Sequence, residues 1–167
     1  MVRFIEEEEP VADPPRVPPT PVDAPWHLWV VGGLSLLWNA FGAYDYTMTQ
    51  SGNAAYLSAA AEQMGVTAQQ AFEYFSSFPA WMVAFWALGV WGALAGSVLL
   101  LLRTRFAFAA FALSLLGLAV STAYQVTASS PDWLETSTDS TMTIVIWSVA
   151  AFLLIYAFSM TMKRVLR

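Results

Sequence analysis

Four long runs without any Asp, Glu, Lys or Arg dominate this sequence and limit what it can fold into. They are residues 24–44, 74–102, 106–131 and 140–162. A helix that crosses the hydrocarbon core of a bilayer needs roughly 20 apolar residues, and each run contains a segment of that length. The sequence therefore predicts an all-α fold, an integral membrane four-helix bundle. Its spans are expected at about residues 26–46, 80–102, 106–126 and 142–162.

The composition supports a membrane protein and limits the number of domains. Only 11% of the 167 residues are charged, whereas soluble domains normally carry about 25%. Four spans and their links nearly exhaust the chain, so we expect no second folded domain. The predicted parts are an arm, residues 1–25, and a four-span membrane domain, residues 26–167.

All seven basic residues fall on one side of the four predicted spans. They are Arg3, Arg16, Arg103, Arg105, Lys163, Arg164 and Arg167. Residues 45–79 and 128–141, which would lie on the opposite side, contain no Lys or Arg. Lys and Arg near span ends mark the cytoplasmic side of a membrane, and acidic residues count little. We therefore expect an integral membrane protein with both termini in the cytoplasm and an acidic outer face.

The arm combines an acidic run, Glu6 to Glu9, with seven of the nine prolines of the chain. Proline interrupts helices and biases its neighbours toward extended geometry. The composition predicts a polyproline-like or disordered cytoplasmic arm. Two interpretations of it remain open: a solvated tether, or a spacer that lets Phe4 and Ile5 dock on a cytoplasmic partner.

The long outer loop, residues 47–79, is expected to form short helices at the membrane surface. Residues 53–64 are rich in helix formers, and Gly65 is a natural stop. Thr67 and Gln70 have the spacing of a capping box, which predicts a second helix. The aromatic residues of that helix are expected along the membrane surface: Phe72, Tyr74, Phe75 and Phe78. A further helical turn is expected after Ser129.

Small or weakly polar residues recur at helical spacing within each predicted span. Such stripes let helix backbones approach closely, which matters because lipid supplies no hydrophobic force between helices. In the first three spans we assign helix packing to Gly32, Gly42, Gly89, Gly92, Gly96, Ser114, Gly117 and Ser121. In the fourth span the corresponding stripe is Ser148, Ala151, Ile155 and Ser159. The Gly92 to Gly96 spacing also fits a dimer contact, although packing within the chain is favoured.

The four-span topology brings several polar residues to one depth near the outer face. They are Asn39, Asp45, Tyr124, Gln125 and Trp147. One hypothesis is an outer polar cleft that binds a small ligand or a lipid headgroup. The other is a hydrogen-bond network that locks the bundle, since buried polar groups need partners in any case. The network is the favoured interpretation.

The sequence offers no recognisable catalytic constellation. It has one histidine, His27, and no cysteine, and a single ligand does not make a metal site. No ionisable residue lies in the middle of a predicted span, whereas proton-coupled carriers usually have one there. We therefore expect a protein that is not an enzyme, without cofactor, metal or nucleic-acid partner.

Several segments of residues 26–167 resemble a known family: small four-span bacterial membrane proteins of uncharacterised function, common in alphaproteobacteria and sometimes labelled sugar transporters. The segments that carry the resemblance are residues 36–46 (LLWNAFGAYDY), 55–57 (AYL), 74–75 (YF), 78–81 (FPAW), 86–92 (WALGVWG), 99–103 (LLLLR), 114–117 (SLLG) and 124–125 (YQ). The resemblance implies a four-span fold, and the family label implies transport. The missing intramembrane charge argues against the latter. The resemblance does not extend to the arm, residues 1–25.

Three functional hypotheses follow from these patterns. The favoured one is a non-catalytic accessory or structural subunit of a larger inner-membrane complex, with membrane lipids and other membrane subunits as partners. The first alternative is a small-solute or lipid-interacting, transporter-like protein that uses the outer polar cleft. The second is an envelope sensor whose outer helices perceive a signal.

Overall fold

In the computed structural model, which describes residues 23–63, 65–128 and 140–167, the regular elements are helices. They are α1 (Trp26–Gln50), α2 (Ala54–Gln63), α3 (Ala68–Ser76), α4 (Ala80–Leu101), α5 (Phe106–Thr127) and α7 (Ser140–Met162). The predicted all-α class is thus confirmed for the described part of the chain. Phe4, Ile5 and the turn expected after Ser129 lie outside the described residues.

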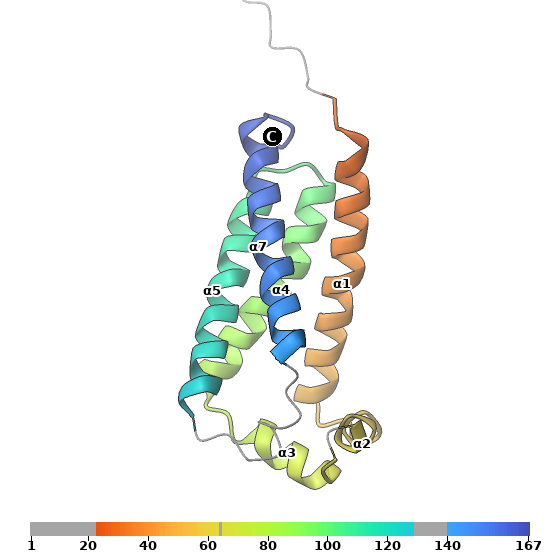
Figure 1. Ribbon diagram of the computed structural model, residues 1–167, viewed down its shortest axis with the longest axis vertical. Coiled ribbons are helices and arrows are strands. Elements are labelled where there is room, and N and C mark those ends of the chain that lie inside the picture. The colour runs from red at the N-terminus through yellow and green to blue at the C-terminus, as the bar shows by residue number, and fades with distance from the viewer. Residues whose placement is uncertain (1–22, 64, 129–139) are drawn as a thin grey trace, which may run out of the picture.

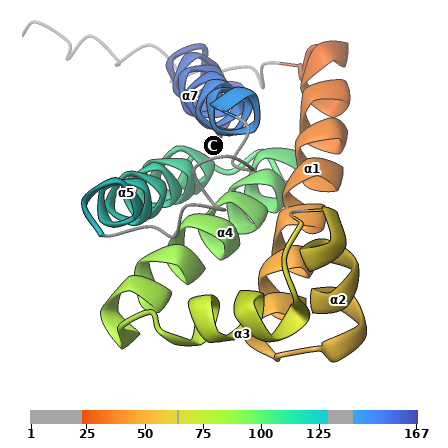
Figure 2. The ribbon, with the colours of Figure 1, turned by 60° about the horizontal axis from the view of Figure 1, so that its bottom comes forward.

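The four long helices form an antiparallel bundle, and the two short helices cover one of its ends (Figure 1). The most extensive contact joins α4 to α5, as expected for a hairpin with a very short link. On either side of this pair, α1 lies against α4 and α7 lies against α5. Contact between α1 and α7, which form the fourth side of the bundle, is slight, and this side is here called the α1–α7 seam (Figure 2).

Three of the helices are long and apolar enough to cross a membrane: α4, α5 and residues Thr141–Met162 of α7. The helix α1 has 25 residues but does not reach that hydropathy. Its most apolar stretch still contains polar residues, His27, Ser35 and Asn39, which lower its hydropathy. Three of the four predicted spans thus correspond to helices that are long and apolar enough to cross a membrane.

Glycines bring the backbones of α4 and α5 close together. A Cβ on Gly117 would clash with the backbone of Gly89, and one on Gly96 would come within 2.7 Å of the Phe111 ring. Across the same interface, the Ser114 hydroxyl donates a hydrogen bond to the Gly89 carbonyl oxygen at 2.5 Å. Close backbone approach of this kind holds helices together where apolar burial contributes little.

On α1, only one of the two glycines assigned to helix packing lies at a helix contact. Gly32 of α1 is buried, and a Cβ there would meet the Leu101 side chain at 2.5 Å. A Cβ on Gly42, in contrast, would meet nothing within 4 Å, so Gly42 is not at a helix contact.

On α7 the predicted stripe was wrong. The face that turns inward carries Leu153, Ala157 and Met160, while Ser148 and Ile155 are exposed. The Ser148 hydroxyl donates to the Ile144 carbonyl oxygen of its own helix at 2.7 Å. Because a serine can satisfy its hydroxyl within its helix, its position does not identify the packed face.

One end of the bundle, here called the basic end, holds the link between α4 and α5 and the residues after α7. Arg103, Arg105, Lys163, Arg164 and Arg167 all belong to these segments. The Arg105 N–H donates to the Arg167 carbonyl oxygen, and the Arg167 N–H donates to that of Arg103, both at 2.8 Å. Val165 and Leu166 are buried beside this pair of bonds.

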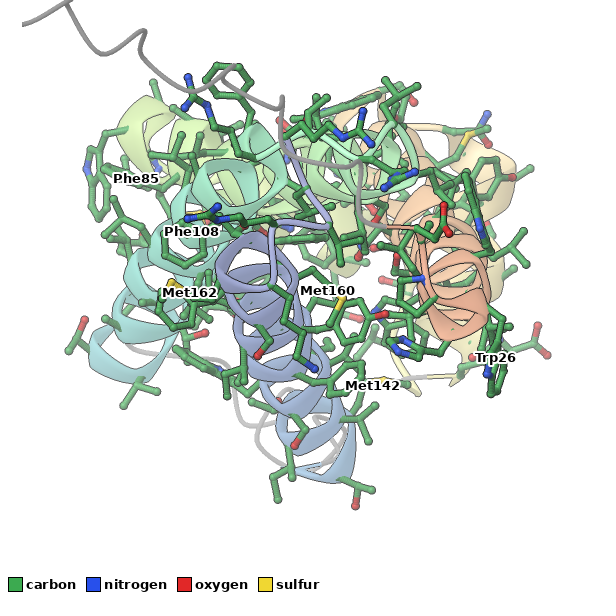
Figure 3. The ribbon with its side chains drawn as sticks, turned by 90° about the horizontal axis from the view of Figure 1, so that it is seen from above. Trp26, Phe85, Phe108, Met142, Met160 and Met162 are labelled. Carbon is green, nitrogen blue, oxygen red and sulfur yellow. The ribbon has the colours of Figure 1, made fainter. Side chains whose placement is uncertain are left out.

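Next to the basic end, side chains from all four long helices fill the interior of the bundle. This core consists of Leu28, Leu100, Ala107, Phe111, Leu153, Ala157, Met160, Val165 and Leu166. Met160 lies between α7 and α1 (Figure 3). The His27 Nδ1 and the Tyr156 hydroxyl, 2.6 Å apart, join α1 to α7 at this level. The α1–α7 seam is therefore closed in the basic half of the bundle.

The other end, here called the capped end, is covered by α2 and α3 (Figure 1). The Thr67 capping box is confirmed: its hydroxyl accepts from the Gln70 N–H, and its own N–H donates to the Gln70 side chain. The aromatic residues of this region do not simply line the surface as expected. Phe75 and Phe78 lie within about 6 Å of the Trp86 ring of α4, measured between ring centroids.

Candidate ligand-binding site

A pocket of about 420 Å³ lies in the capped half of the bundle, between the four long helices. It is lined by Trp38, Asn39, Phe41, Gly42, Asp45, Trp86, Gly89, Val90, Ala93, Phe111, Ser114, Leu118, Ser121, Met142, Ile146, Val149, Ala150 and Leu153. Pockets for small molecules typically measure about 300–1,000 Å³ and are mostly apolar with a few polar groups. This pocket has both properties.

The pocket exists because small residues replace large ones where the seam is open. Gly42, Gly89, Ala93 and Ala150 contribute little side-chain volume to the space between the helices. Towards the basic end, the pocket is closed by Phe111 and residues of the core.

The rim of the pocket lies on the α1–α7 seam. Phe41 of α1 and Met142 of α7 line the pocket and are both exposed on the surface of the bundle. The pocket therefore extends to exposed residues of both α1 and α7.

Asn39 supplies a buried amide side chain to the pocket, with 9% of its surface exposed. Its Nδ2 donates to the Ser97 Oγ at 2.8 Å and to the Ala93 carbonyl oxygen at 3.2 Å. A carbonyl oxygen can only accept, so the nitrogen must face α4 and Oδ1 must face away from it. Among the described residues no hydrogen-bond donor meets Oδ1, which leaves this acceptor to the pocket.

Two serines of α5 present oxygens on the same side. The Ser114 hydroxyl donates to the Gly89 carbonyl oxygen at 2.5 Å, and the Ser121 hydroxyl donates to that of Gly117 at 2.8 Å. A hydroxyl has one proton, so each serine retains only acceptor lone pairs. The hydroxyl and amide groups of the pocket thus offer acceptors rather than donors.

Among the described residues that line the pocket, Asp45 is the only ionisable one. One of its carboxylate oxygens accepts a hydrogen bond from the hydroxyl of Tyr56 in α2. Burial, followed by this hydrogen bond and the carboxylate charge, raises the pKa of the Tyr56 hydroxyl above its ordinary value of 10.0. The tyrosine therefore stays protonated and fixes the Asp45 carboxylate to α2.

Aromatic rings form part of the pocket lining. Trp38, Phe41 and Trp86 are among the lining residues. Trp86 is held in place by Tyr46, whose ring meets it edge to face at 5.0 Å, and by Phe75, which stacks on it at 6.0 Å. The cap formed by α3 thus positions one wall of the site.

The residues predicted for the outer polar cleft are only partly brought together. Asn39 and Asp45 line the pocket, but Tyr124, Gln125 and Trp147 do not. The Tyr124 ring instead meets Trp81 edge to face at 5.3 Å on the other side of α4. Trp147 follows Ile146, a lining residue, and one helical step rotates it by about 100° away from the pocket.

Sequence reasoning assigned Ser114 and Ser121 to helix packing and overlooked that they also line the pocket. It also missed Trp86, Ala93 and Ile146 as lining residues. Asn39, Gly42 and Asp45 follow one another at spacings of three along α1, and Ser114, Leu118 and Ser121 at spacings of four and three along α5. These helical faces were visible in the sequence, but the open seam that turns them into a pocket was not.

Within the described ranges no three His, Cys, Asp or Glu side chains gather in a way that would hold a metal ion. No protein-family model, no curated protein and no solved structure matches this chain. The resemblance to four-span bacterial proteins therefore stays a prediction, and the function must be argued from the pocket.

Proposed function

We propose that this chain is a four-span integral membrane protein without catalytic activity that binds an amphiphilic small molecule in the pocket between α1, α4, α5 and α7. The observation that carries the proposal is the pocket itself, an apolar space of about 420 Å³ with an unmatched buried acceptor on Asn39. A hollow of this kind costs stability unless something occupies it, because its lining loses packing contacts.

In this proposal α1 crosses the membrane as well, in addition to α4, α5 and α7. Its 25 residues extend about 37 Å at about 1.5 Å per residue, which exceeds the roughly 30 Å of a bilayer core. It packs lengthwise on α4, itself apolar enough to cross a membrane. Its polar Asn39 is directed into the bundle, so it does not meet lipid.

The positive-inside rule gives the proposed orientation of the protein in the membrane. The basic end would face the cytoplasm of a bacterium, and the capped end would face outward across the inner membrane. In this orientation the pocket lies at the depth of the outer leaflet, and the α1–α7 seam opens to lipid.

Photolabelling tests the proposal. The protein, in phosphatidylcholine nanodiscs, is irradiated with a dodecanol that bears a diazirine, and the labelled residues are located by mass spectrometry. We expect labelling of the pocket segment of α7, residues 142–153, that excess dodecanol suppresses. Ala150→Phe, which fills the pocket, should abolish this saturable labelling, whereas Ala95→Phe, on an exposed position of α4, should not. Labelling that excess dodecanol fails to suppress would overturn the proposal.

The open seam also supports a second candidate, the accessory subunit of a larger membrane complex. In that case a transmembrane helix of a partner would occupy the seam beside Ile146, which is partly exposed and lines the pocket. A photocrosslinking amino acid at Ile146 distinguishes the two in native membranes. Crosslinks to a second protein would favour the subunit, and crosslinks to lipid-sized molecules would favour the binding protein.

A further inference from the structure

We infer that the polar end of the ligand is an organic ammonium group that binds Asp45. The inference rests on the proposed function, since it names the class of molecule that the pocket would take. It is drawn from three independent properties of the pocket: its hydrogen-bonding groups, its charge and its aromatic rings.

The hydrogen-bonding groups favour a ligand that donates. Asn39 directs its nitrogen to α4 and leaves Oδ1 free, and Ser114 and Ser121 use their hydroxyl protons on carbonyl oxygens of α4 and α5. Only the indole N–H groups of Trp38 and Trp86 remain as donors among the lining residues. A buried acceptor without a donor costs free energy, so a ligand that brings N–H groups is favoured over one that brings only acceptors.

The charge of the site favours a cation. Asp45 carries the one formal charge among the lining residues, and the only partner of its carboxylate within the described chain is the neutral Tyr56 hydroxyl. The loop that follows α1, residues 45–79, contains no Lys or Arg, and the basic residues of the membrane domain lie at the opposite end. In the part of the chain that the structure describes, no Lys or Arg therefore lies near Asp45 to neutralise it.

The aromatic rings favour the same kind of head group. Trp38, Phe41 and Trp86 line the pocket together with Asp45. The face of an aromatic ring attracts an organic cation, and tryptophan does so most strongly. An anionic head group would meet the Asp45 carboxylate instead, and like charges repel. The apolar remainder of the pocket, formed by Leu118, Ile146 and Val149, suits an alkyl chain.

Competition against the diazirine dodecanol tests the inference. Unlabelled dodecylammonium and unlabelled dodecanol are compared as competitors at neutral pH in nanodiscs of phosphatidylcholine, which has no net charge. For the unaltered protein we expect dodecylammonium to compete at a concentration roughly tenfold below that of dodecanol, the scale of one charge-assisted contact. In Asp45→Asn, which keeps an acceptor for Tyr56, the two competitors should become equal.

The controls separate this inference from the proposed function. Because the ratio of two competitors is compared between variants, partitioning into lipid cancels. Tyr56→Phe keeps the carboxylate and should keep the preference for the ammonium. Saturable labelling with equal competition in the unaltered protein would overturn the ammonium inference and leave the proposed function standing. An unchanged tenfold preference in Asp45→Asn would overturn the role of Asp45, and absence of saturable labelling would overturn both proposals.

Discussion

The two halves of the bundle are built from the same four helices but differ in how they are filled. In the basic half, Leu28, Leu100, Phe111 and Met160 close the interior, and His27 meets Tyr156 across the seam. In the capped half the same helices enclose a pocket of about 420 Å³, and the seam is open. The difference shows that a helix pair can be joined at one level, His27 and Tyr156, and exposed about four turns away, at Phe41 and Met142.

Residue size on α1 accounts for part of this difference. The inward positions of α7 are of similar size in the two halves, with Ala157 and Met160 in the core, Ile146 and Ala150 at the pocket, and Leu153 at both. Opposite them, α1 offers Leu28 in one half and Gly42 in the other. The filled half can hold the helices together while the hollow half remains free to take a ligand.

The largest expected effect on the free energy of unfolding comes from shortening a core side chain in the basic half. Leu100 is fully buried, so Leu100→Ala should lower the free energy of unfolding by about 2–5 kcal/mol, measured in mixed micelles. Ile146 is 38% exposed and already borders a void, so Ile146→Ala should cost less than about 1.5 kcal/mol, in the range of an Ile→Val change. Equal losses would contradict the contrast between the halves.

The interface between α4 and α5, which both halves share, should be destabilised by a substitution at a single glycine. The Cβ of Gly117→Ala would meet the backbone of Gly89 and Phe85, and overpacking of this kind costs about 1–3 kcal/mol. The matched control is Gly33→Ala in α1, where a Cβ meets nothing and where alanine in a helix gains up to about 1 kcal/mol. Unfolding in mixed micelles compares the two variants. A Gly117→Ala protein as stable as the parent would show that the helices are not in close contact.

A smaller effect is expected from the polar link between α1 and α4 at the floor of the pocket. Asn39→Ala and Ser97→Ala, alone and combined, form a double-mutant cycle for the 2.8 Å hydrogen bond between their side chains. Interhelical hydrogen bonds in membrane proteins average about 0.6 kcal/mol and reach about 1.7 kcal/mol. A coupling energy indistinguishable from zero would remove this link and, with it, the assignment of Oδ1 to the pocket.

The smallest effect is expected at the cap, and it depends on pH. Because the pKa of Tyr56 is raised in the folded protein, the folded state holds the phenol proton more firmly than the unfolded chain. Its contribution to stability is therefore complete below pH 10 and declines as the pH rises above that value. Thermal unfolding should show a fall in Tm as the pH rises above 10, and Tyr56→Phe should reduce this fall. An identical fall in both proteins would exclude Tyr56 as a source.

Much of the fold was predictable because its signals are local. Runs of apolar residues predicted α4, α5 and α7, the Thr67 and Gln70 pair predicted the start of α3, and the Gly89 to Gly96 stripe marked a face that packs on α5. Each of these depends on neighbouring residues of one helix, so a pattern in the sequence carries it.

The pocket was less predictable because it depends on which two helices fail to meet. Asn39 and Asp45 were expected in a cleft, but Tyr124 turns to Trp81 and leaves it. The link between His27 and Tyr156 joins residues 129 positions apart in the sequence and has no local signal. The phase of α7 was misjudged because its serines bond to their own helix.

The free energy of unfolding of two matched variants tests the contrast between the halves most directly. Ala150 and Ala157 lie seven residues apart on α7 and so share nearly the same face, about 20° apart. Ala150 lines the pocket, whereas Ala157 is 0% exposed in the core. We predict that Ala157→Phe lowers the free energy of unfolding by about 1–3 kcal/mol or more, while Ala150→Phe leaves it within roughly 0.5 kcal/mol. Equal losses for the two variants would contradict a hollow capped half.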